Sequence, residues 1–385
     1  MVKIKVQPQD FVVTELIRLT PGEKGDYTIL ELKKSFWNTL DVIEQVSRKM
    51  HVQKTLFARA GLKDRYSLST QYLSYKGDFH ETITEKNYTL KPVGKSRMPV
   101  SPRLLHGNAF CITLRNMTAQ EVSTVDRNKE EVRKYGFPNY FDEQRFGSAR
   151  HRQGFIAKKM ILEHYAGALK LLMCHAYKEE STREKRFKKY CLSHWRDWRG
   201  CSKIAPPFYQ PILRHLIQNP KDFKNALKRI DRQFLNIYLL AYQSYMFNDV
   251  LARLVKTYGQ DNAVVKYSMG ELLFYRRLPD IDSMRGLLVP MINEKTHLSG
   301  ELGQIIGKVL KREGIVQKQM ALQKMRLRGV RFKPFMRKAV IFPDDLSITD
   351  PAPDELYEKK QRRTLKCTLP PGTYATVLIK RLLVG

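Results

Sequence analysis

Strand-like segments lie near both ends of this chain, and a helix-dominated stretch separates them. Residues 11–19 (FVVTELIRL) and 27–33 (YTILELK) are β-rich runs separated by PGEKGD, whose proline and glycines are typical of a turn. They are predicted to be neighbouring strands. Residues 339–342 (AVIF) and 374–380 (YATVLIK) predict further strands near the other end. We therefore expect the two ends of the chain to form one sheet.

The first 150 residues add helices to these strands. Residues 110–115 (FCITLR) predict a strand, and residues 119–135 predict a charged helix that a following glycine ends. Thr39 is a candidate N-cap for another helix, with Leu40 and Ile43 on one side. This mixture indicates an α+β core.

The middle of the chain is predicted to be helical. Apolar residues recur at spacings of three and four within residues 155–177 and again within 233–258. The predicted fold class is α+β. Residues 1–154 and 338–385 are expected to form this mixed core, and residues 155–337 a largely helical domain inserted into it.

The charge of the chain points to a polyanionic partner. Lysine and arginine number 69 and aspartate and glutamate 38, which leaves a formal net charge of +31. Nucleic acid is the first candidate partner and an anionic membrane surface the second. No stretch approaches the roughly 18 apolar residues of a membrane span, and the first residues lack the apolar core of a signal peptide. We expect a cytoplasmic protein without a membrane segment.

Two basic stretches are candidates for contact with RNA. In residues 308–338 eleven cations accompany one acid, Glu313; in residues 183–203 cations alternate with Tyr190, Trp195 and Trp198. Cations hold phosphates and aromatic rings stack on unpaired bases. The alternatives are a solvated face for the first stretch and core packing of the tryptophans for the second. The residues predicted to contact RNA are Arg326, Arg328, Arg331 and Lys333.

Cysteines and common motifs indicate neither a disulfide framework nor a cofactor. The chain lacks a CxxC pair, a phosphate-binding GxxxxGK[ST] loop, GxGxxG, HExxH and GxSxG. A zinc site at Cys191, His194 and Cys201 would lack a fourth ligand at a familiar spacing. We therefore expect no metal and no cofactor, and a chemistry that depends on a carboxylate.

Residues 57–71 (FARAGLKDRYSLSTQ) contain a carboxylate in a setting that suits such chemistry. Gly61 is expected to allow a tight turn after a short β-like run, so that Lys63, Asp64 and Arg65 are presented at the end of a sheet. A Lys-Asp pair after a glycine is also ordinary turn chemistry. The residues of this segment alone do not decide between the two interpretations.

Several strings in this sequence resemble those of a known enzyme family. AGLKDR at 60–65, followed by Thr70 and Gln71, resembles the AGxKDRxAxTxQ signature of TruD-type pseudouridine synthases. NYFDEQRFG at 139–147 resembles the NYFGxQRFG of that family. DFVVTE at 10–15, HGNAF at 106–110, QSYMFN at 243–248 and LPPGTYAT at 369–376 follow the same pattern in chain order. The resemblance therefore spans nearly the whole chain.

The resemblance implies a fold, a substrate and an activity. The expected fold is the pseudouridine synthase catalytic core, with a mixed, mainly antiparallel sheet, and an inserted TRUD domain. The expected activity is conversion of uridine to pseudouridine in tRNA, at uridine 13 of the D stem. Neither a cofactor nor an obligate protein partner is implied. The alternative is a non-catalytic RNA-binding or RNA-chaperone protein on the same fold.

The resemblance also assigns roles to particular residues. Asp64 matches the catalytic aspartate of the KDR motif, and Lys5 matches an active-site lysine that precedes DFxVxE. Asn139 and Phe141 match pocket residues, the phenylalanine stacking on the target base. Glu15 matches the acid of DFxVxE and is expected to contact substrate. Without the resemblance, Phe141 would equally suit a core aromatic and Asn139 an ordinary loop residue.

This chain departs from the family pattern in two places. Asp142 stands where many members have glycine, which puts the backbone of that loop in question. Tyr66 and Leu68 replace the small residues that often follow KDR, a change expected to affect packing more than chemistry.

Overall fold

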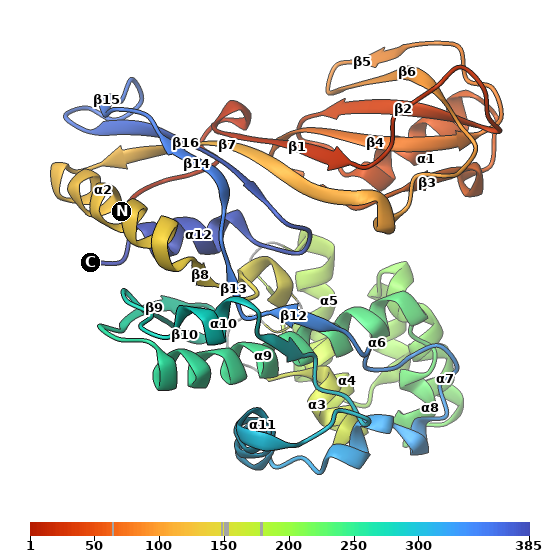
Figure 1. Ribbon diagram of the computed structural model, residues 1–385. Helices are drawn as coiled ribbons and strands as arrows, with labels where there is room; N and C mark the ends of the chain where they lie inside the picture. The colour runs from red at the N-terminus through yellow and green to blue at the C-terminus, as the bar shows by residue number, and fades with distance from the viewer. Residues whose placement is uncertain (64, 148, 150–153, 178–179) are drawn as a thin grey trace. The chain divides into compact units, whose positions relative to one another are not determined.

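The computed structural model describes residues 1–385 except 64, 148, 150–153 and 178–179. The chain forms two compact units (Figure 1). The first comprises Met1–Gly136 and Ile341–Gly385, and the second comprises Phe137–Val340. The first unit is therefore built from both ends of the chain.

A mixed sheet organises the described part of the first unit. It has ten strands, eight of them in the order β14-β16-β7-β1-β4-β2-β6-β5, with β15 beside β16 and β3 beside β4. β1 and β4 are parallel, and the other pairs are antiparallel, which confirms the predicted fold class. The strands are β1 (Phe11–Ile17), β2 (Tyr27–Lys34), β3 (Phe57–Arg59), β4 (Leu68–Lys76), β5 (Ile83–Glu85), β6 (Tyr88–Ser96), β7 (Leu105–Met117), β14 (Asp344–Ile348), β15 (Ala352–Pro353) and β16 (Gln361–Leu369).

The predicted pairing of the first two strands is wrong. β4 lies between them, with Leu68 opposite Val12 of β1 and Leu73 opposite Leu30 of β2. Alternation of apolar and polar residues identifies a strand but not its partner, because pairing depends on segments distant in sequence. The consequence for function is that β1 is placed directly beside the strand that follows residues 60–65.

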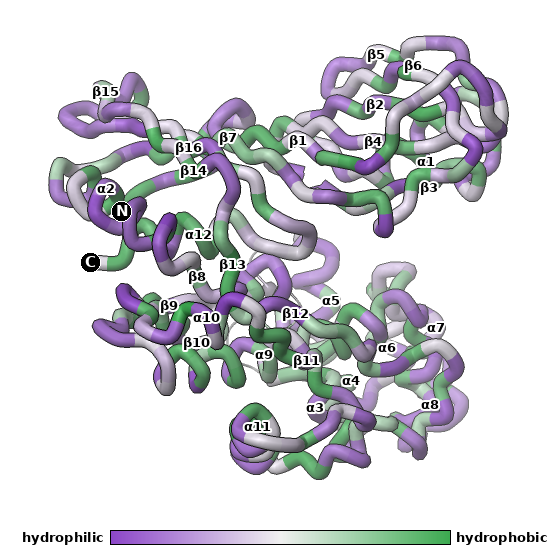
Figure 2. Tube along the Cα trace, viewed as in Figure 1, coloured by the Kyte–Doolittle hydropathy of each residue, from purple (hydrophilic) through white to green (hydrophobic). Residues whose placement is uncertain are grey.

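Helix α1 (Thr39–Lys49) packs its apolar side on β2, β4 and β6. Val42 and Val46 are fully buried there, and apolar and polar residues alternate along this half of the sheet (Figure 2). The N-cap is Asn38 rather than Thr39, and Leu40 is 46% exposed. The Thr39 hydroxyl instead donates to a glutamine of β4, so Thr39 faces inward and the next residue, about 100° further round the helix, faces solvent.

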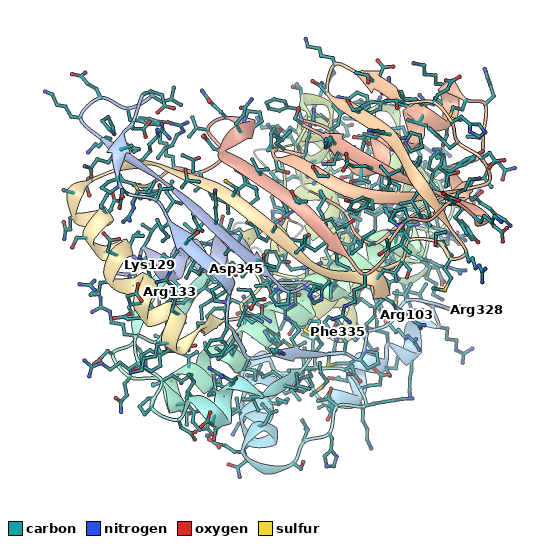
Figure 3. The ribbon with its side chains drawn as sticks, turned by 45° about the horizontal axis from the view of Figure 1, so that its top comes forward. Arg103, Lys129, Arg133, Arg328, Phe335 and Asp345 are labelled. Carbon is teal, nitrogen blue, oxygen red and sulfur yellow. The ribbon has the colours of Figure 1, made fainter. Side chains whose placement is uncertain are left out.

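Helices α2 (Ala119–Tyr135) and α12 (Ala375–Leu382) pack together beside β7 and β16 (Figure 1). The α2 prediction is confirmed: Thr118 and Glu121 form a capping box, and Gly136 ends the helix at φ 68°. Asn128 donates to the carbonyl of Leu382 at 2.9 Å, which joins the two helices. Arg133, labelled in Figure 3, donates to the sheet edge at the carbonyl of Leu346.

The strand predicted at residues 374–380 is wrong, because this segment is α12. A short, continuous apolar run fits a buried helix as well as a buried strand, since it has no polar residues to reveal its period. The C-terminal segment nevertheless reaches the sheet, through β14 and β16.

The second unit is largely helical. The predicted long helix is confirmed as α9, but residues 155–177 form two helices, separated near Glu163, whose φ is 58°. Residues 339–342 contribute only the two-residue strand β13. The elements are β8 (Phe137–Pro138), α3 (Ile156–Ile161), α4 (Tyr165–Cys174), α5 (Thr182–Ser193), α6 (Trp198–Ile204), α7 (Gln210–Gln218), α8 (Phe223–Leu227), α9 (Arg232–Tyr258), β9 (Ala263–Tyr267), β10 (Gly270–Phe274), α10 (Ile281–Arg285), β11 (Leu288–Pro290), α11 (Gly300–Glu313), β12 (Met336–Lys338) and, at the unit boundary, β13 (Val340–Ile341).

Within the described ranges, no helix combines the length and apolar character that crossing a bilayer requires.

One buried arginine joins distant segments of the first unit. Arg115 of β7 pairs with Asp10 at 2.8 Å, Asp354 at 3.0 Å and Glu355 at 3.0 Å, and its side chain is 5% exposed. The hydrogen bond from Arg115 lowers the pKa of Glu355 to about 2. The backbones of Arg115 and Lys3 also exchange two hydrogen bonds of 2.9 Å. This cluster therefore fixes the N-terminal segment and the segment after β15 on the same strand.

We predict that Arg115→Met lowers the free energy of unfolding by about 3–5 kcal/mol, because two buried carboxylates lose their cation. Urea denaturation measures this. The control is Arg48→Ala, which removes an exposed pair with Glu44 and is expected to cost about 0–1 kcal/mol. A loss of less than about 1 kcal/mol for Arg115→Met would show that the cluster does not organise the unit.

Candidate active site

The predicted site residue Lys5 lies in a segment that is fixed on both sides. Lys3 and Asp10, which flank it, are both bound to Arg115. Lys5 has a φ of 60°, and its Nζ lies 4.2 Å from the centroid of the Phe11 ring. Its ammonium group is therefore positioned over the first residue of β1 and is partly buried there.

Glu15 forms a buried ion pair with the lysine of the KDR motif. Its Oε1 accepts from Lys63 Nζ at 2.7 Å, and its Oε2 accepts from the backbone N–H of Tyr72 at 3.0 Å. The Lys63 side chain is 8% exposed and that of Glu15 is fully buried. Both carboxylate oxygens are thus engaged inside the protein. The predicted substrate contact of Glu15 stays a prediction, and the contacts seen here attach the KDR loop to β1.

Lys63 is also held through its backbone. Its carbonyl oxygen accepts from Lys34 Nζ at 3.2 Å, and its N–H lies 3.5 Å from Thr39 Oγ1. Lys34 is 1% exposed, so a second ammonium group is buried at this loop. Two residues further on, Arg65 donates from Nε to the carbonyl of Phe36 at 2.9 Å. The loop is therefore anchored both before and after residue 64.

The predicted catalytic residue, Asp64, lies outside the described residues. Its neighbours in the chain, Lys63 and Arg65, are the anchored residues just described. Gly61 does not occupy the left-handed region, so its conformation does not require glycine. A glycine turn at Gly61 therefore does not hold the loop in place. The loop is held by the contacts of Lys63.

In the second unit, Asn139 is hydrogen-bonded through four polar groups. Its backbone N–H donates to the carbonyl of Ala339 at 2.9 Å, and its Nδ2 donates to the carbonyl of Lys338 at 3.0 Å. Arg337 donates to its backbone oxygen at 3.1 Å and to its Oδ1 at 2.8 Å. All of these partners belong to residues 337–339. Asn139 is therefore fixed against one short segment.

Phe141 is a buried ring with fixed backbone. It is 2% exposed, and its N–H and carbonyl exchange two hydrogen bonds of 2.8 Å with the side chain of Asn248. Its ring meets Phe247 edge to face at 5.4 Å. The guanidinium of Arg337 lies 4.0 Å from the ring centroid. Its contact with a base stays a prediction; the structure shows a packed aromatic whose position is tightly determined.

Asp142 caps the turn that follows. Its Oδ1 accepts from the N–H of Glu143 at 2.8 Å, and its φ is −97°, which any residue adopts. The aspartate therefore suits this loop in place of the glycine found in many family members.

The basic segment that follows α11 has buried anchors and exposed cations. Met325, Val330 and Phe332 are buried, while α9 holds the backbone through Asn236 and Gln243, the latter donating to the carbonyl of Lys333 at 2.9 Å. The four cations predicted to contact RNA, Arg326, Arg328, Arg331 and Lys333, are exposed. Arg328 and the 39% exposed Phe335 are labelled in Figure 3.

The one acid of this basic stretch is buried among basic side chains. Glu313 is 8% exposed and is bound to Lys158, Arg312 and Tyr242 at 2.8–3.0 Å. Burial alone would raise the pKa of Glu313, but the hydrogen bonds from Lys158 and Tyr242 outweigh it and lower the pKa. The carboxylate is therefore neutralised internally.

The second basic stretch contains core residues. Trp198 is 3% exposed and contacts Trp195 at 4.8 Å, as the core-packing alternative predicts. Cys191 and Cys201 are buried with their sulfur atoms 3.0 Å apart, and His194 stacks on Tyr190. Among the described residues no group of three or more histidine, cysteine, aspartate or glutamate side chains is arranged to hold a metal ion.

Three residues that hold the KDR loop, Asn139 or Phe141 in place were not identified from the sequence. Lys34 precedes α1 without any motif, and Arg337 was one cation among eleven. Asn248 is the last residue of QSYMFN, so a signal for it was present.

Comparisons with known proteins agree with the resemblance of the motifs. A sequence model of the family described as tRNA pseudouridine synthase D (TruD) matches residues 1–382. The chain is 30% identical to a probable tRNA pseudouridine synthase D 2 of Methanocaldococcus jannaschii, over 100% of this chain and 92% of the relative. It is 30% identical to the tRNA pseudouridine synthase D of Aquifex aeolicus, over 99% and 98% of the two chains.

A solved structure is similar as well. The crystal structure of the putative TruD of Methanosarcina mazei superimposes with a TM-score of 0.74 at 25% identity, covering 99% of this chain and 93% of the other. Fold, motifs and relatives define one class of protein, the RNA-modifying isomerases. The chain belongs to the TruD family of tRNA pseudouridine synthases.

We predict that Glu15 and Lys63 are strongly coupled in a double-mutant cycle. Removing Lys63 alone leaves a buried carboxylate, and removing Glu15 alone leaves a buried ammonium, so each costs about 3–5 kcal/mol. The variants are Glu15→Gln, Lys63→Met and the double variant, compared by urea denaturation. The expected coupling energy is at least about 1.5 kcal/mol. The exposed pair Lys49–Glu85 is the control, and equal coupling in the two pairs would contradict the buried role.

Proposed function

We propose that this protein converts uridine 13 in the D stem of tRNA to pseudouridine, with Asp64 as the catalytic carboxylate. The observation that carries the proposal is the family match over residues 1–382, in which AGLKDR supplies the aspartate of the KDR motif. The anchored loop supports it, because a catalytic group must be held within a fraction of an ångström of its working position.

The reaction requires nothing besides the protein and the RNA. The N1–C1′ bond of the uridine breaks, the uracil turns, and a C5–C1′ bond forms. The hydrogen on C5 is lost and N1 gains one, so the product is an isomer of the substrate. The Asp64 carboxylate acts as a nucleophile on base or sugar, or as the base that removes a sugar proton.

Asp64 is proposed to act in its ionised form. Lys34 donates to the carbonyl of Lys63, so a buried ammonium group lies at the residue that precedes Asp64 in the chain. Lys63 is paired with Glu15. Burial would raise the pKa of an aspartate, and a nearby cation opposes that rise. Lys5 is proposed to add a further cation.

Asn139 and Phe141 are proposed to hold the extruded uracil. A base in a duplex must leave the stack to reach a catalytic group, at a cost of a few kcal/mol. Stacking of the base on an aromatic ring contributes roughly 1–3 kcal/mol of binding free energy. The amide of Asn139 keeps one N–H and one oxygen lone pair beyond the contacts described, which matches the N3–H and a carbonyl of uracil.

Phosphate contacts are proposed to supply most of the binding free energy. Arg326, Arg328, Arg331 and Lys333 are exposed on a backbone that α9 fixes. Residues 155–337 would then act as the tRNA-binding insert, and residues 1–154 and 338–385 as the catalytic core.

We predict that Asp64→Asn reduces pseudouridine formation by at least about 10³-fold while tRNA still binds, because the carboxylate acts on the reaction and not on the phosphates. Unmodified tRNA is incubated with each variant and pseudouridine is mapped chemically. The control is Asp78→Asn, which changes an exposed aspartate paired with Lys95 and is expected to leave the rate unchanged. Product formed by Asp64→Asn at the normal rate would remove Asp64 from its proposed role. Binding without product in the wild type would indicate the non-catalytic alternative.

We predict that a fourfold alanine variant binds tRNA more weakly and that its affinity depends less steeply on salt concentration. The residues replaced are Arg326, Arg328, Arg331 and Lys333. Each lost phosphate contact lowers the slope of log K against log salt by roughly 0.7–0.9, or by about 3 for four contacts. Filter binding over a range of salt concentrations measures the slope. The control replaces Lys24, Lys54, Lys76 and Lys86, four exposed lysines of the first unit. Equal slope changes in the two variants would mean that only net charge matters.

A further inference from the structure

Arg337 differs from the other cations of the basic stretch because it points inward. It is the middle residue of β12 and is 9% exposed, whereas Met336 and Lys338 on either side are exposed. Successive residues of a strand face opposite sides, so one residue of the run 336–338 is turned into the second unit. A surface role in binding phosphate does not account for this placement.

The guanidinium of Arg337 determines how the Asn139 amide is turned. Its Nη2 donates to Oδ1 of Asn139 at 2.8 Å and to the backbone oxygen at 3.1 Å. The amide nitrogen on the other side donates to the carbonyl of Lys338. Because arginine only donates, the atom that faces it must be the amide oxygen. The donor and acceptor that remain on the amide are thereby fixed in direction.

The same guanidinium packs on two aromatic rings. It lies 4.0 Å from the centroid of Phe141 and 5.3 Å from that of Phe247. A guanidinium over an aromatic face is attracted to the ring electrostatically, and most strongly where water is excluded. Asn248 holds the backbone of Phe141, and Arg337 packs on the ring at a shorter distance than Arg145, whose guanidinium lies 5.4 Å from the centroid. One side chain thus touches both residues that are proposed to hold the uracil.

We propose that Arg337 is a positioning residue for the reaction, setting the direction of the Asn139 amide and the plane of the Phe141 ring for an extruded uracil. This inference rests on the proposed function. Arg337 acts through its two neighbours and needs no contact with the RNA. Lysine cannot replace it, because an ammonium group lacks the planar fork that stacks on a ring while donating sideways.

Arg337→Lys tests the inference under conditions in which the fold is kept. We expect kcat to fall by about 100-fold, the size of effect that a misplacement of about 1 Å produces, with KM for tRNA within about threefold of the wild type. The control is Arg363→Lys, a buried arginine of the first unit that pairs with Asp126. We expect a similar change in melting temperature in the two variants, and an unchanged kcat in Arg363→Lys.

Arg337→Ala allows a second measurement, rescue of kcat by added guanidinium, which a purely structural role of Arg337 would not produce. Free guanidinium, at concentrations far below those that unfold the protein, is expected to raise the kcat of this variant several-fold. The kcat is calculated per folded molecule, with the folded fraction measured by circular dichroism. A kcat for Arg337→Lys within about twofold of the wild type, a change confined to KM, or a folded Arg337→Ala protein that guanidinium leaves unchanged would each overturn the inference. If the wild type forms no pseudouridine, the proposed function fails instead.

Discussion

The buried ion pair between Glu15 and Lys63 is the interaction on which the first unit's candidate site depends. Burying two charges costs several kcal/mol per ion unless their geometry is close and their remaining groups are satisfied. Here the contact is 2.7 Å, and the second carboxylate oxygen accepts from the backbone of β4. Breaking the pair would cost several kcal/mol, so the KDR loop stays attached to β1. These contacts hold Lys63, the residue before Asp64 in the sequence.

The two kinds of polar group in this protein serve different ends. Buried groups, such as Lys34 and Arg337, bind backbone carbonyls or side-chain amides and fix the groups beside them. Exposed cations of the stretch after α11 stand on a backbone held by α9 and leave their charge at the surface. Buried contacts suit a step that needs accurate geometry, and exposed positive charge suits binding to a phosphate backbone. A net charge of +31 is thus compatible with buried polar groups that are held by specific hydrogen bonds.

Sequence patterns predicted the elements whose information is local. Helix α2 has a capping box and a terminal glycine, and α9 repeats its apolar residues over seven turns, so both were predicted closely. Residues 374–380 are too short and too uniformly apolar to show a period, and strand order depends on distant partners. Asp64 and Asn139 were proposed only through motifs, because a turn aspartate and a loop asparagine are common. Arg337 was missed because its burial is set by the tertiary structure.

The central proposal is that Asp64 is the catalytic carboxylate and acts on an extruded uracil of tRNA. A structure of the Asp64→Asn variant bound to unmodified tRNA tests it most directly, since the substrate accumulates without reacting. Uridine 13 is expected to have left the D stem, with its ring against the side chain of residue 64. A target uridine that stays stacked in the stem, or a base bound out of contact with residue 64, would contradict it.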